Sequence, residues 1–533
     1  MWSRVKRTLL AQDLQRQYRD TKMKIKALSR SMDVHGPSRS GDAPRVSHNL
    51  DPALHPFSKP REYTRALNAA KLERMHAKPF VGALEGHSDG VYCLAKDPQR
   101  LGVIASGAGD GEIRLWDMPT QTLLTSYPRA HQGIVSSVVI SPLHFSQQGN
   151  AVSMGSSEES NSRMGARRLL SCSTDRTIKL WDADPHSDRL GPSFMDEDED
   201  EESNELTSGG GILGGSNPWK ADADRSEPLR VWNTKTAINS LSHHATEPIF
   251  ASASSSVQTW DITRGAASSS AGGGALREMG WGAESINVVR FNPSEQQVLA
   301  GAGSDRGVVL YDLRSGQPLT KMVMKMRAND ISWSPIEPTT FALASEDHNV
   351  YTFDMRNLSG ARQIYKDHVS AVMSVDFSPT GQELVSGSYD RTLRIWTLNK
   401  GNHSRDVYHG ARMQRIFSTL FTQDARFVVS GSDDGNVRLW KARASEKLGI
   451  GSGKERAARE YREQLISRYR NTGDVGRIER QRRMPKAIKN AQGLKRTMLD
   501  AQRVKEERRR KHTRAGEEKP KAARKDAILA IKE

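Results

Sequence analysis

The side chains that could do chemistry in this chain are aspartates, histidines and aromatic residues that recur along its middle. Six aspartates each stand six residues before an aromatic side chain: Asp110 before Trp116, Asp175 before Trp181, Asp305 before Tyr311, Asp347 before Phe353, Asp390 before Trp396 and Asp434 before Trp440. Upstream lie His87, His131, His368 and His409. An aspartate in a turn hydrogen-bonds nearby main-chain groups, and a buried histidine needs a polar partner. We therefore predict structural hydrogen-bond networks at these positions.

These residues do not form a catalytic or metal-binding pattern. The histidines lack the paired spacing of metal ligands, and no nucleophile stands out together with a base and an orienting group. The glycine-rich stretches 209–215 and 272–274 indicate flexible loops, because no Lys-Ser/Thr follows them at a helix start. Cys93 and Cys172 are too few for a disulfide framework and indicate a reducing compartment. We expect no enzyme activity, metal or cofactor.

Charge is distributed unevenly along the 533 residues, whose net charge is +16. Residues 441–533 carry a net +16 and residues 1–80 a net +10, whereas residues 81–440 carry a net −10. Two basic segments on either side of an acidic body indicate arms that bind a polyanion. No stretch approaches the roughly 18 apolar residues of a membrane span, and the first ten residues lack an apolar signal region. The composition therefore predicts a soluble intracellular protein that makes no membrane contact.

The aromatic residues mark the ends of a repeated unit. Each unit reads as an apolar strand, a turn of small residues with the aspartate, and a second strand; a seventh ends at Trp260 but has Ser254 in the aspartate's place. The last three spacings, of 42, 43 and 44 residues, match one four-stranded propeller blade. The pattern resembles the WD-repeat family. This resemblance implies an all-β fold, a seven-bladed β-propeller over residues 79–440, with a basic N-terminal arm at 1–78 and a basic helical extension at 441–533.

Insertions and one long-range strand pairing complete the predicted propeller. Insertions are expected at 143–166 and 183–227, and the second contains seven consecutive acids at 196–202, which form a solvated loop or contact basic protein tails. Residues 228–232 should resume as the delayed outer strand of the second blade. Residues 79–84 should pair as the outer strand of the last blade, which closes the ring and removes a free sheet edge.

The C-terminal extension has a helical pattern. Ala457, Tyr461, Leu465 and Tyr469 recur every four residues, and Gly473 and Gly476 are expected to end that helix. A second helical run leads from residue 494 to residue 511. Both runs have little apolar area, so we expect them to become ordered on a partner. The basic runs could be a solvated tail, a nuclear import signal around 508–511, or a nucleic-acid interface that recognises shape and backbone; we favour the last.

Sequence strings at both ends resemble a narrower group. The stretches 49–57, 60–63, 65–68, 71–75 and 77–80, together with 480–489 and 494–498, look like the leading segment and C-terminal domain of the Sof family of WD-repeat proteins. Family members tend to begin near residue 23, so residues 1–22 look like an extension or a misassigned start codon. The acidic insertion is longer than the family needs.

The Sof resemblance implies a non-catalytic scaffold of the nucleolar small-subunit processome, which supports maturation of the small-subunit (18S) ribosomal RNA. The implied partners are pre-ribosomal RNA, the U3-type box C/D small nucleolar ribonucleoprotein and other processome proteins. The residues predicted to bind RNA or processome proteins are Arg61, Lys71, Arg482, Arg483, Lys486, Lys489, Lys495, Arg496, Arg508, Arg509, Arg510 and Lys511.

A second pattern supports an alternative function. Arg314 and Arg356 each end an aromatic-Asp-x-Arg box on consecutive repeats, which resembles the boxes of WD-repeat substrate receptors for cullin-four ubiquitin ligases. The two arginines would then contact a ligase adaptor. The boxes could equally hold arginines that bond a neighbouring blade or point into solvent, because such short strings arise often.

Overall fold

The computed structural model describes residues 57–145, 166–183, 227–263, 274–449, 452–514 and 522–532, together with 54, 517 and 519. The predicted extension at 1–22, the acidic run at 196–202 and most of both predicted insertions lie outside the described residues. The chain divides into two compact units. One comprises residues 1–74 with 447–479, and the other comprises residues 75–446 with 480–533.

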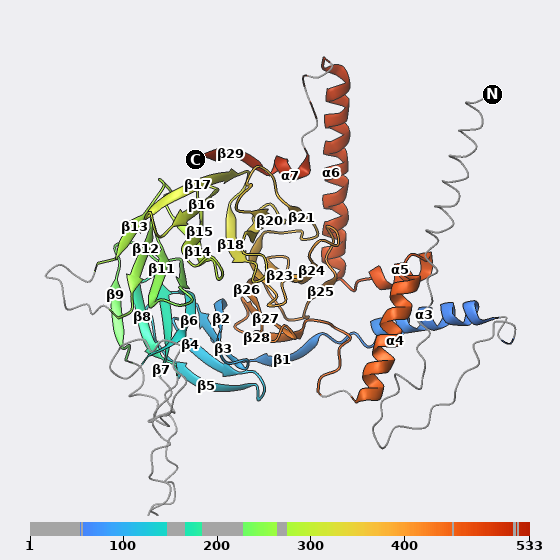
Figure 1. Cartoon of the computed structure of the whole chain (residues 1–533), viewed down its shortest axis with the longest axis horizontal. Coiled ribbons are helices and arrows are strands. Elements are labelled where there is room, and N and C mark those ends of the chain that lie inside the picture. Colours follow the sequence, from blue (N-terminus) through green and yellow to red (C-terminus); the bar gives the residue numbers. More distant parts are fainter. Residues whose placement is uncertain are drawn as a thin grey trace, which may run out of the picture. The chain divides into compact units, whose positions relative to one another are not determined.

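The described strands of the second unit form seven antiparallel sheets, which confirms the predicted seven-bladed propeller (Figure 1). Blade 1 contains β2 (Val91–Lys96), β3 (Val103–Ala108), β4 (Ile113–Asp117) and β5 (Thr122–Tyr127). Blade 2 contains β6 (Val135–Phe145), β7 (Ala166–Ser173), β8 (Thr177–Asp182) and β9 (Arg230–Asn233). Blade 3 contains β10 (Ser240–His243), β11 (Ile249–Ala253), β12 (Val257–Asp261) and β13 (Arg277–Met279).

The later blades follow the same order of strands. Blade 4 contains β14 (Ile286–Phe291), β15 (Val298–Gly303), β16 (Gly307–Asp312) and β17 (Gln317–Met324). Blade 5 contains β18 (Ala328–Trp333), β19 (Thr340–Ser345), β20 (Val350–Asp354) and β21 (Gln363–Tyr365). Blade 6 contains β22 (Val372–Phe377), β23 (Glu383–Ser388), β24 (Leu393–Thr397) and β25 (Asp406–Tyr408). Blade 7 contains β26 (Ile416–Phe421), β27 (Phe427–Ser432), β28 (Val437–Lys441) and β1 (Phe80–Leu84).

The ring closes through a pairing between distant parts of the chain. Strand β1 lies antiparallel to β28, with Phe80 opposite Trp440 and Leu84 opposite Val437. The rings of Phe80 and Trp440 pack edge to face, with centroids 5.5 Å apart. Strand β9 pairs with β8 after the second insertion. Both long-range pairings confirm the predictions, and the first removes the free edges that an open sheet would expose.

The predicted turn aspartates organise the hairpins between the second and third strands of six blades. In each turn the first carboxylate oxygen accepts the backbone N–H two residues later, at distances between 2.9 and 3.4 Å. The residue between has a positive φ, from +63° to +82°, and is Gly111, Arg176, Arg306, His348, Arg391 or Gly435. The aspartate therefore stabilises a left-handed backbone conformation that most side chains disfavour.

Apolar strand residues pack between neighbouring blades. Strand β2 alternates buried and partly buried residues, whereas all six residues of β19 are buried. Trp181, Trp396 and Trp440 are among the largest fully buried side chains of the described chain. Each such tryptophan belongs to a hydrophobic cluster that joins two adjacent blades, so the aromatic residues of the repeat stabilise the contacts between blades.

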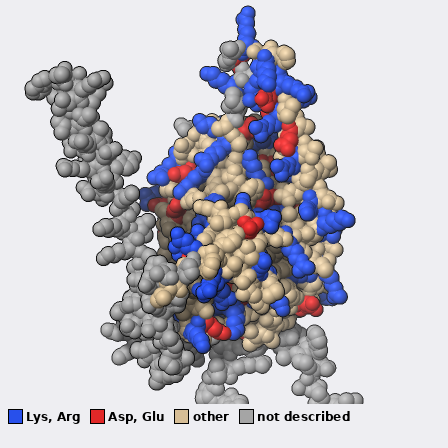
Figure 2. Space-filling model, turned by 90° about the vertical axis from the view of Figure 1, so that its right-hand side faces the viewer, with Lys and Arg blue, Asp and Glu red and all other residues tan. Residues whose placement is uncertain are grey.

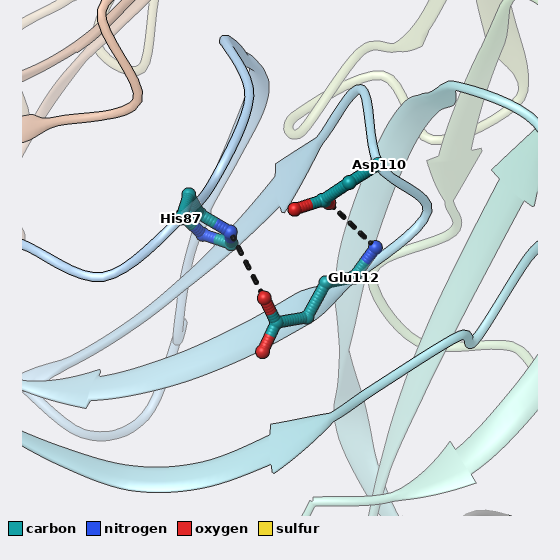
Figure 3. Close-up of side chains that lie close together, drawn as sticks. All are labelled: His87, Asp110 and Glu112. Carbon is teal, nitrogen blue, oxygen red and sulfur yellow. Dashed lines mark hydrogen bonds and ion pairs between the residues drawn. The ribbon is translucent and has the colours of Figure 1, made fainter.

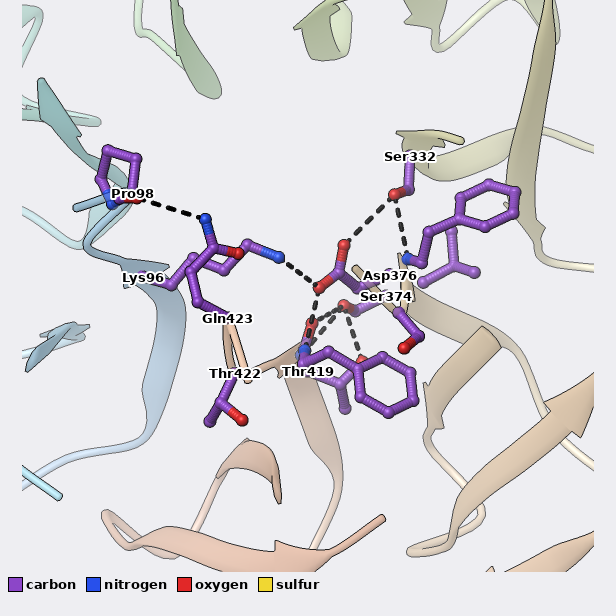
Figure 4. A network of polar contacts seen from close by, with 12 residues as sticks. Lys96, Pro98, Ser332, Ser374, Asp376, Thr419, Thr422 and Gln423 are labelled. Atoms are coloured by element: carbon purple, nitrogen blue, oxygen red, sulfur yellow. Dashed lines mark hydrogen bonds and ion pairs between the residues drawn. The ribbon is translucent and has the colours of Figure 1, made fainter. Parts of the chain in front are cut away.

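A polar network ties innermost strands of several blades together (Figure 4). Asp376 of blade 6 accepts hydrogen bonds from Lys96 of blade 1 at 3.2 Å, from Ser332 of blade 5 at 3.2 Å and from the backbone N–H of Phe421 of blade 7 at 2.9 Å. Nearby, Gln423 donates to the carbonyl of Pro98 at 3.4 Å. Because one carboxylate joins four blades, this network holds the ring in register in addition to the strand closure.

The described part of the other unit is helical. Its described helices are α3 (Ser58–Met75), α4 (Gly453–Tyr469) and α5 (Gly473–Arg480). Ala69 and Ala70 of α3 form a small buried core with Ile466 of α4 and Val475 of α5. The N-terminal segment thus supplies the partner surface that the stripe on α4 requires, and Leu465 of that stripe is buried. The first helix ends before Gly473 as predicted, but Gly476 lies buried inside α5 and does not end a helix.

The C-terminal segment of the propeller unit contains a long helix and an unpredicted strand. Helix α6 (Lys486–His512) spans 27 residues, none of them buried, and includes the predicted run 494–511. After α7 (Ala523–Asp526), strand β29 (Ile528–Lys532) pairs antiparallel with β17 as the fifth strand of blade 4. None of the described helices is long and apolar enough to cross a membrane.

Candidate nucleic-acid interface and the polar networks beside it

The predicted polar networks are complete in blades 2 and 6. In blade 6, the indole N–H of Trp396 donates to Ser386 at 2.8 Å, Ser386 lies 2.7 Å from Nε2 of His368, and Nδ1 of His368 lies 2.9 Å from Asp390. In blade 2 the same chain runs through Trp181, Ser171, His131 and Asp175, with a histidine–aspartate distance of 3.0 Å. Each polar group of these two networks therefore has a hydrogen-bond partner inside the protein, where little water is available.

Burial sets the ionisation of these groups. Burial lowers the pKa of His368, and the attraction of Asp390 offsets only part of that shift. Burial by itself raises the pKa of Asp390, but His368, Arg394 and Thr392 outweigh it, so the pKa of this carboxyl is lowered well below its usual range. These opposing contacts are those of a structural ion-pair network, which also shifts pKa values.

Blade 1 departs from this pattern (Figure 3). His87 lies 2.7 Å from Ser106, but Asp110 accepts from Ser88 at 2.6 Å, and Nδ1 of His87 faces Glu112 at 3.8 Å without a hydrogen-bond partner. Burial lowers the pKa of His87 to about 4. His87, Asp110 and Glu112 are the three described ligand groups close enough to hold a metal ion. Arg114 already pairs with Glu112 at 2.8 Å, so we assign no metal there.

Blade 7 uses another arrangement. Trp440 donates to Ser430 at 2.8 Å, but Asp434 pairs with Arg438 and not with a histidine. His409, which the sequence places at the start of this blade, has a backbone hydrogen bond with Arg483 of the segment before α6. The predicted histidine of blade 7 therefore contacts the C-terminal segment and not the turn aspartate.

Most of the predicted RNA-binding residues are on exposed helical surfaces. Arg61 and Lys71 lie exposed on α3, and Arg483 lies exposed just before α6. Exposed residues of α6 are Lys486, Lys489, Arg496, Arg508, Arg509 and Lys511, while Arg510 is partly exposed. Figure 2 shows Lys and Arg side chains on the visible face of the projection at the top of the view, where α6 rises in Figure 1.

The cations of α6 are only weakly neutralised. Arg510 lies 3.7 Å from Glu506, and Lys511 lies 3.8 Å from Glu507, one helical turn away in each case. Arg496 lies 4.0 Å from Asp500 with 87% of its side chain exposed. Such exposed pairs contribute little stability, so these cations can exchange their partners for phosphate oxygens at small cost.

Two of the predicted residues instead hold the C-terminal segment against the propeller. Lys495 donates to the backbone carbonyl of His368 at 2.8 Å, and burial lowers the pKa of its ammonium group. Arg482 donates from Nε to the carbonyl of Arg405 at 3.1 Å. The sequence offered no signal for this difference, because both residues sit in basic strings like those of their neighbours.

The two aromatic-Asp-x-Arg boxes, which resemble those of ligase substrate receptors, lie at equivalent positions on blades 4 and 5. Arg314 follows the end of β16 and is exposed, and its backbone N–H bonds to Asp312 at 2.9 Å. Arg356 follows the end of β20, is 70% exposed, and pairs with Asp354 at 2.9 Å. Both guanidinium groups can therefore be reached from solvent on consecutive blades.

These features define a class: a seven-bladed WD-repeat propeller with a basic helix in the C-terminal segment that follows the last blade. Residues 78–117, 121–182, 361–397 and 404–441 match the family described as WD domain, G-beta repeat, and residues 442–528 match the Sof1-like domain. The chain is 39% identical to Protein SOF1 of Saccharomyces cerevisiae, over 90% of this chain and 89% of that protein. It is 38% identical to DDB1- and CUL4-associated factor 13 of Homo sapiens, over 96% of this chain and all of that protein.

A further relative of the same name, from Xenopus tropicalis, is 37% identical over 96% of this chain. The chain therefore belongs to the Sof1 family of WD-repeat proteins, which confirms the family that the terminal strings indicate.

Proposed function

We propose that this protein is a non-catalytic scaffold in ribosome biogenesis that acts in the nucleolus as part of the small-subunit processome. It would support processing of 18S ribosomal RNA by binding pre-ribosomal RNA, the U3-type box C/D particle and neighbouring processome proteins. The observation that carries this proposal is α6, a helix of 27 residues without a buried side chain, attached to the propeller and rich in exposed cations. Membership of the Sof1 family supports the same conclusion.

The test is crosslinking in cells followed by sequencing of the bound RNA. Removal of residues 441–533 should abolish crosslinks to pre-ribosomal RNA and impair maturation of the small-subunit RNA, but this deletion also removes α4 and α5. A deletion of residues 486–533 is sharper, because it leaves α3, α4, α5 and the seven blades intact. A deletion of residues 522–532 is the matched control, because it removes β29 but keeps α6. Crosslinks at the wild-type level without α6 would contradict the proposal.

A second candidate function is that of substrate receptor for a cullin-four ubiquitin ligase. The exposure of Arg314 and Arg356 favours it, and the name of the animal relatives states an association with DDB1 and CUL4. The double variant Arg314→Ala, Arg356→Ala should lose the ligase adaptor in co-purification. The matched control, Arg412→Ala with Arg426→Ala, removes two exposed arginines outside the boxes. Equal recovery of adaptor with both double variants would rule the receptor role out.

A further inference from the structure

The chain before and after α6 contacts the propeller, and so does Lys495 in the first half of the helix. Near its start, Lys495 and Arg482 bond to backbone carbonyls of the propeller. Beyond its end, Lys325 pairs with Asp526 at 2.7 Å and its backbone N–H bonds to the carbonyl of Ala527 at 2.9 Å. Strand β29 then adds to blade 4. Because α6 is already formed and its first half is anchored to the propeller, a ligand that binds its second half does not have to order the helix.

The cations of the second half of α6 surround the helix. A helix turns about 100° per residue, so Lys505, Arg508 and Arg509 lie on one side. By the same geometry Arg503, Arg510 and Lys511 lie on the opposite side. All six are at least partly exposed. A single phosphate backbone can contact only one side of such a helix, and the three cations on the other side would then reach no phosphate.

The composition of α6 argues against a single-stranded ligand. Residues 486–512 contain ten Lys and Arg against three acids, but no Phe, Tyr or Trp. Proteins that hold single strands stack bases on aromatic rings, and α6 has no such ring. The ligand must therefore present phosphates on two sides at once, without requiring base stacking.

Duplex RNA satisfies this requirement where its groove is opened. A helix with its side chains is about 10–12 Å wide, and the major groove of regular A-form RNA is deep and narrow. A bulge or internal loop widens that groove locally. We propose that α6 binds in the major groove of bulged duplex RNA, with its two sets of cations contacting the two opposite phosphate backbones. This inference rests on the proposed function and specifies the RNA class that this function would require.

The test uses the full-length protein and three fluorescent RNA probes of equal length: a hairpin with an internal bulge, a hairpin with a perfect stem, and an unstructured single strand. Anisotropy titrations should rank the bulged hairpin first and the single strand last, by at least about tenfold. Equal affinity for the single strand and the bulged hairpin would overturn the inference. The proposed function would survive that result if the deletion of residues 486–533 still removed crosslinks in cells.

Two triple variants test the two-sided contact. Variant A carries Lys505→Gln, Arg508→Gln and Arg509→Gln, and variant B carries Arg503→Gln, Arg510→Gln and Lys511→Gln. Glutamine keeps a high helix propensity. Both should weaken binding to the bulged hairpin to a similar degree, and each should make its salt dependence shallower by about one unit per lost contact. The control, Arg456→Gln with Arg459→Gln and Arg462→Gln on α4, removes the same charge from another exposed helical surface.

Four other outcomes would overturn the two-sided model. Loss of binding in only one of the variants A and B would indicate one-sided docking on a surface. Equal loss in the α4 control would indicate non-specific attraction by net charge. Competition by poly-glutamate as effective as that by unlabelled bulged hairpin would indicate an acidic protein partner. Absence of binding to all three RNA probes would remove both the inference and the proposed function.

Discussion

Blade 6 and α6 contain similar charged residues, but burial gives them opposite roles. In blade 6, Arg394 is 1% exposed, and His368 and Asp390 satisfy each other inside the protein. In α6 no residue is buried, and ion pairs such as that of Arg496 with Asp500 are long and exposed. A buried charge is costly unless it is paired, so it is committed to its partners inside the protein; an exposed charge pairs weakly, so it remains available to a ligand. The degree of burial therefore distinguishes the charged residues that belong to the propeller from those of α6 that can bind a ligand.

The largest expected effect concerns closure of the ring. Deletion of residues 79–84 removes β1 and exposes the edge of β28, so the melting temperature should fall substantially. Deletion of residues 528–532 also removes an edge strand, β29, but leaves the ring closed, and it should lower melting far less. Thermal unfolding followed by circular dichroism compares the two deletions. Unchanged melting without residues 79–84 would refute the role of β1 in closure.

A single buried residue of a blade should matter more than any apolar residue of α6. Trp396 is fully buried between blades, so Trp396→Ala should lower the free energy of unfolding by about 3–5 kcal/mol. Leu494 of α6 is 65% exposed, and Leu494→Ala should change that free energy by less than about 0.5 kcal/mol. Denaturant titration measures both. A similar loss in the two variants would show that α6 packs into the fold after all.

The buried histidine of blade 1 should make stability depend on pH. Its pKa is lowered to about 4 in the folded state from its ordinary value of 6.5, so the unfolded chain takes up the proton first as pH falls. The neutral His87 therefore costs the folded state no stability above pH 6.5. As pH falls from 6.5 towards 4, this one residue should lower the free energy of unfolding by at most about 3 kcal/mol.

The variant His87→Gln isolates this contribution from that of the other buried histidines. Between pH 7 and pH 4, its free energy of unfolding should fall less steeply than that of the wild type. Urea titrations at a series of pH values give the two slopes. Parallel slopes would mean that His87 is not held neutral in the folded protein.

The smallest predicted effect is a difference between variants of two neighbouring residues of α6. Lys495 bonds to the carbonyl of His368, whereas Arg496 projects into solvent. Lys495→Ala should speed hydrogen exchange in the first half of α6 with a loss of global stability below about 1 kcal/mol. Arg496→Ala removes the same charge and should leave exchange unchanged. If both variants exchange like the wild type, Lys495 does not anchor the helix.

The repeated blade pattern could be predicted because it depends on local contacts. An aspartate such as Asp175 bonds two residues ahead, and Trp181 packs at a fixed spacing, so the same signal recurs in each blade. The closing strand at 79–84 was also predictable, since a propeller without it would leave β28 as an open edge.

Other features could not be predicted from the spacing of residues. Strand β29 is a short apolar run, and the periodicity of so short a run cannot distinguish a strand from part of a helix. Only its pairing with β17 defines it as a strand. The core of α3 with α4 and α5 joins segments about 400 residues apart in the chain, and the small Ala69 and Ala70 gave no advance sign of it.

The sequence by itself determined the number of blades, the turn aspartates and the basic character of the C-terminal segment, because these depend on residue type and short-range spacing. Only the tertiary structure decided which charges are buried and which are free. It shows that His87 faces Glu112, that Lys495 anchors α6, and that neighbouring cations remain in solvent. The physical reason is that desolvation depends on all neighbours in space, and identical basic strings do not reveal which residue meets a carbonyl and which meets water.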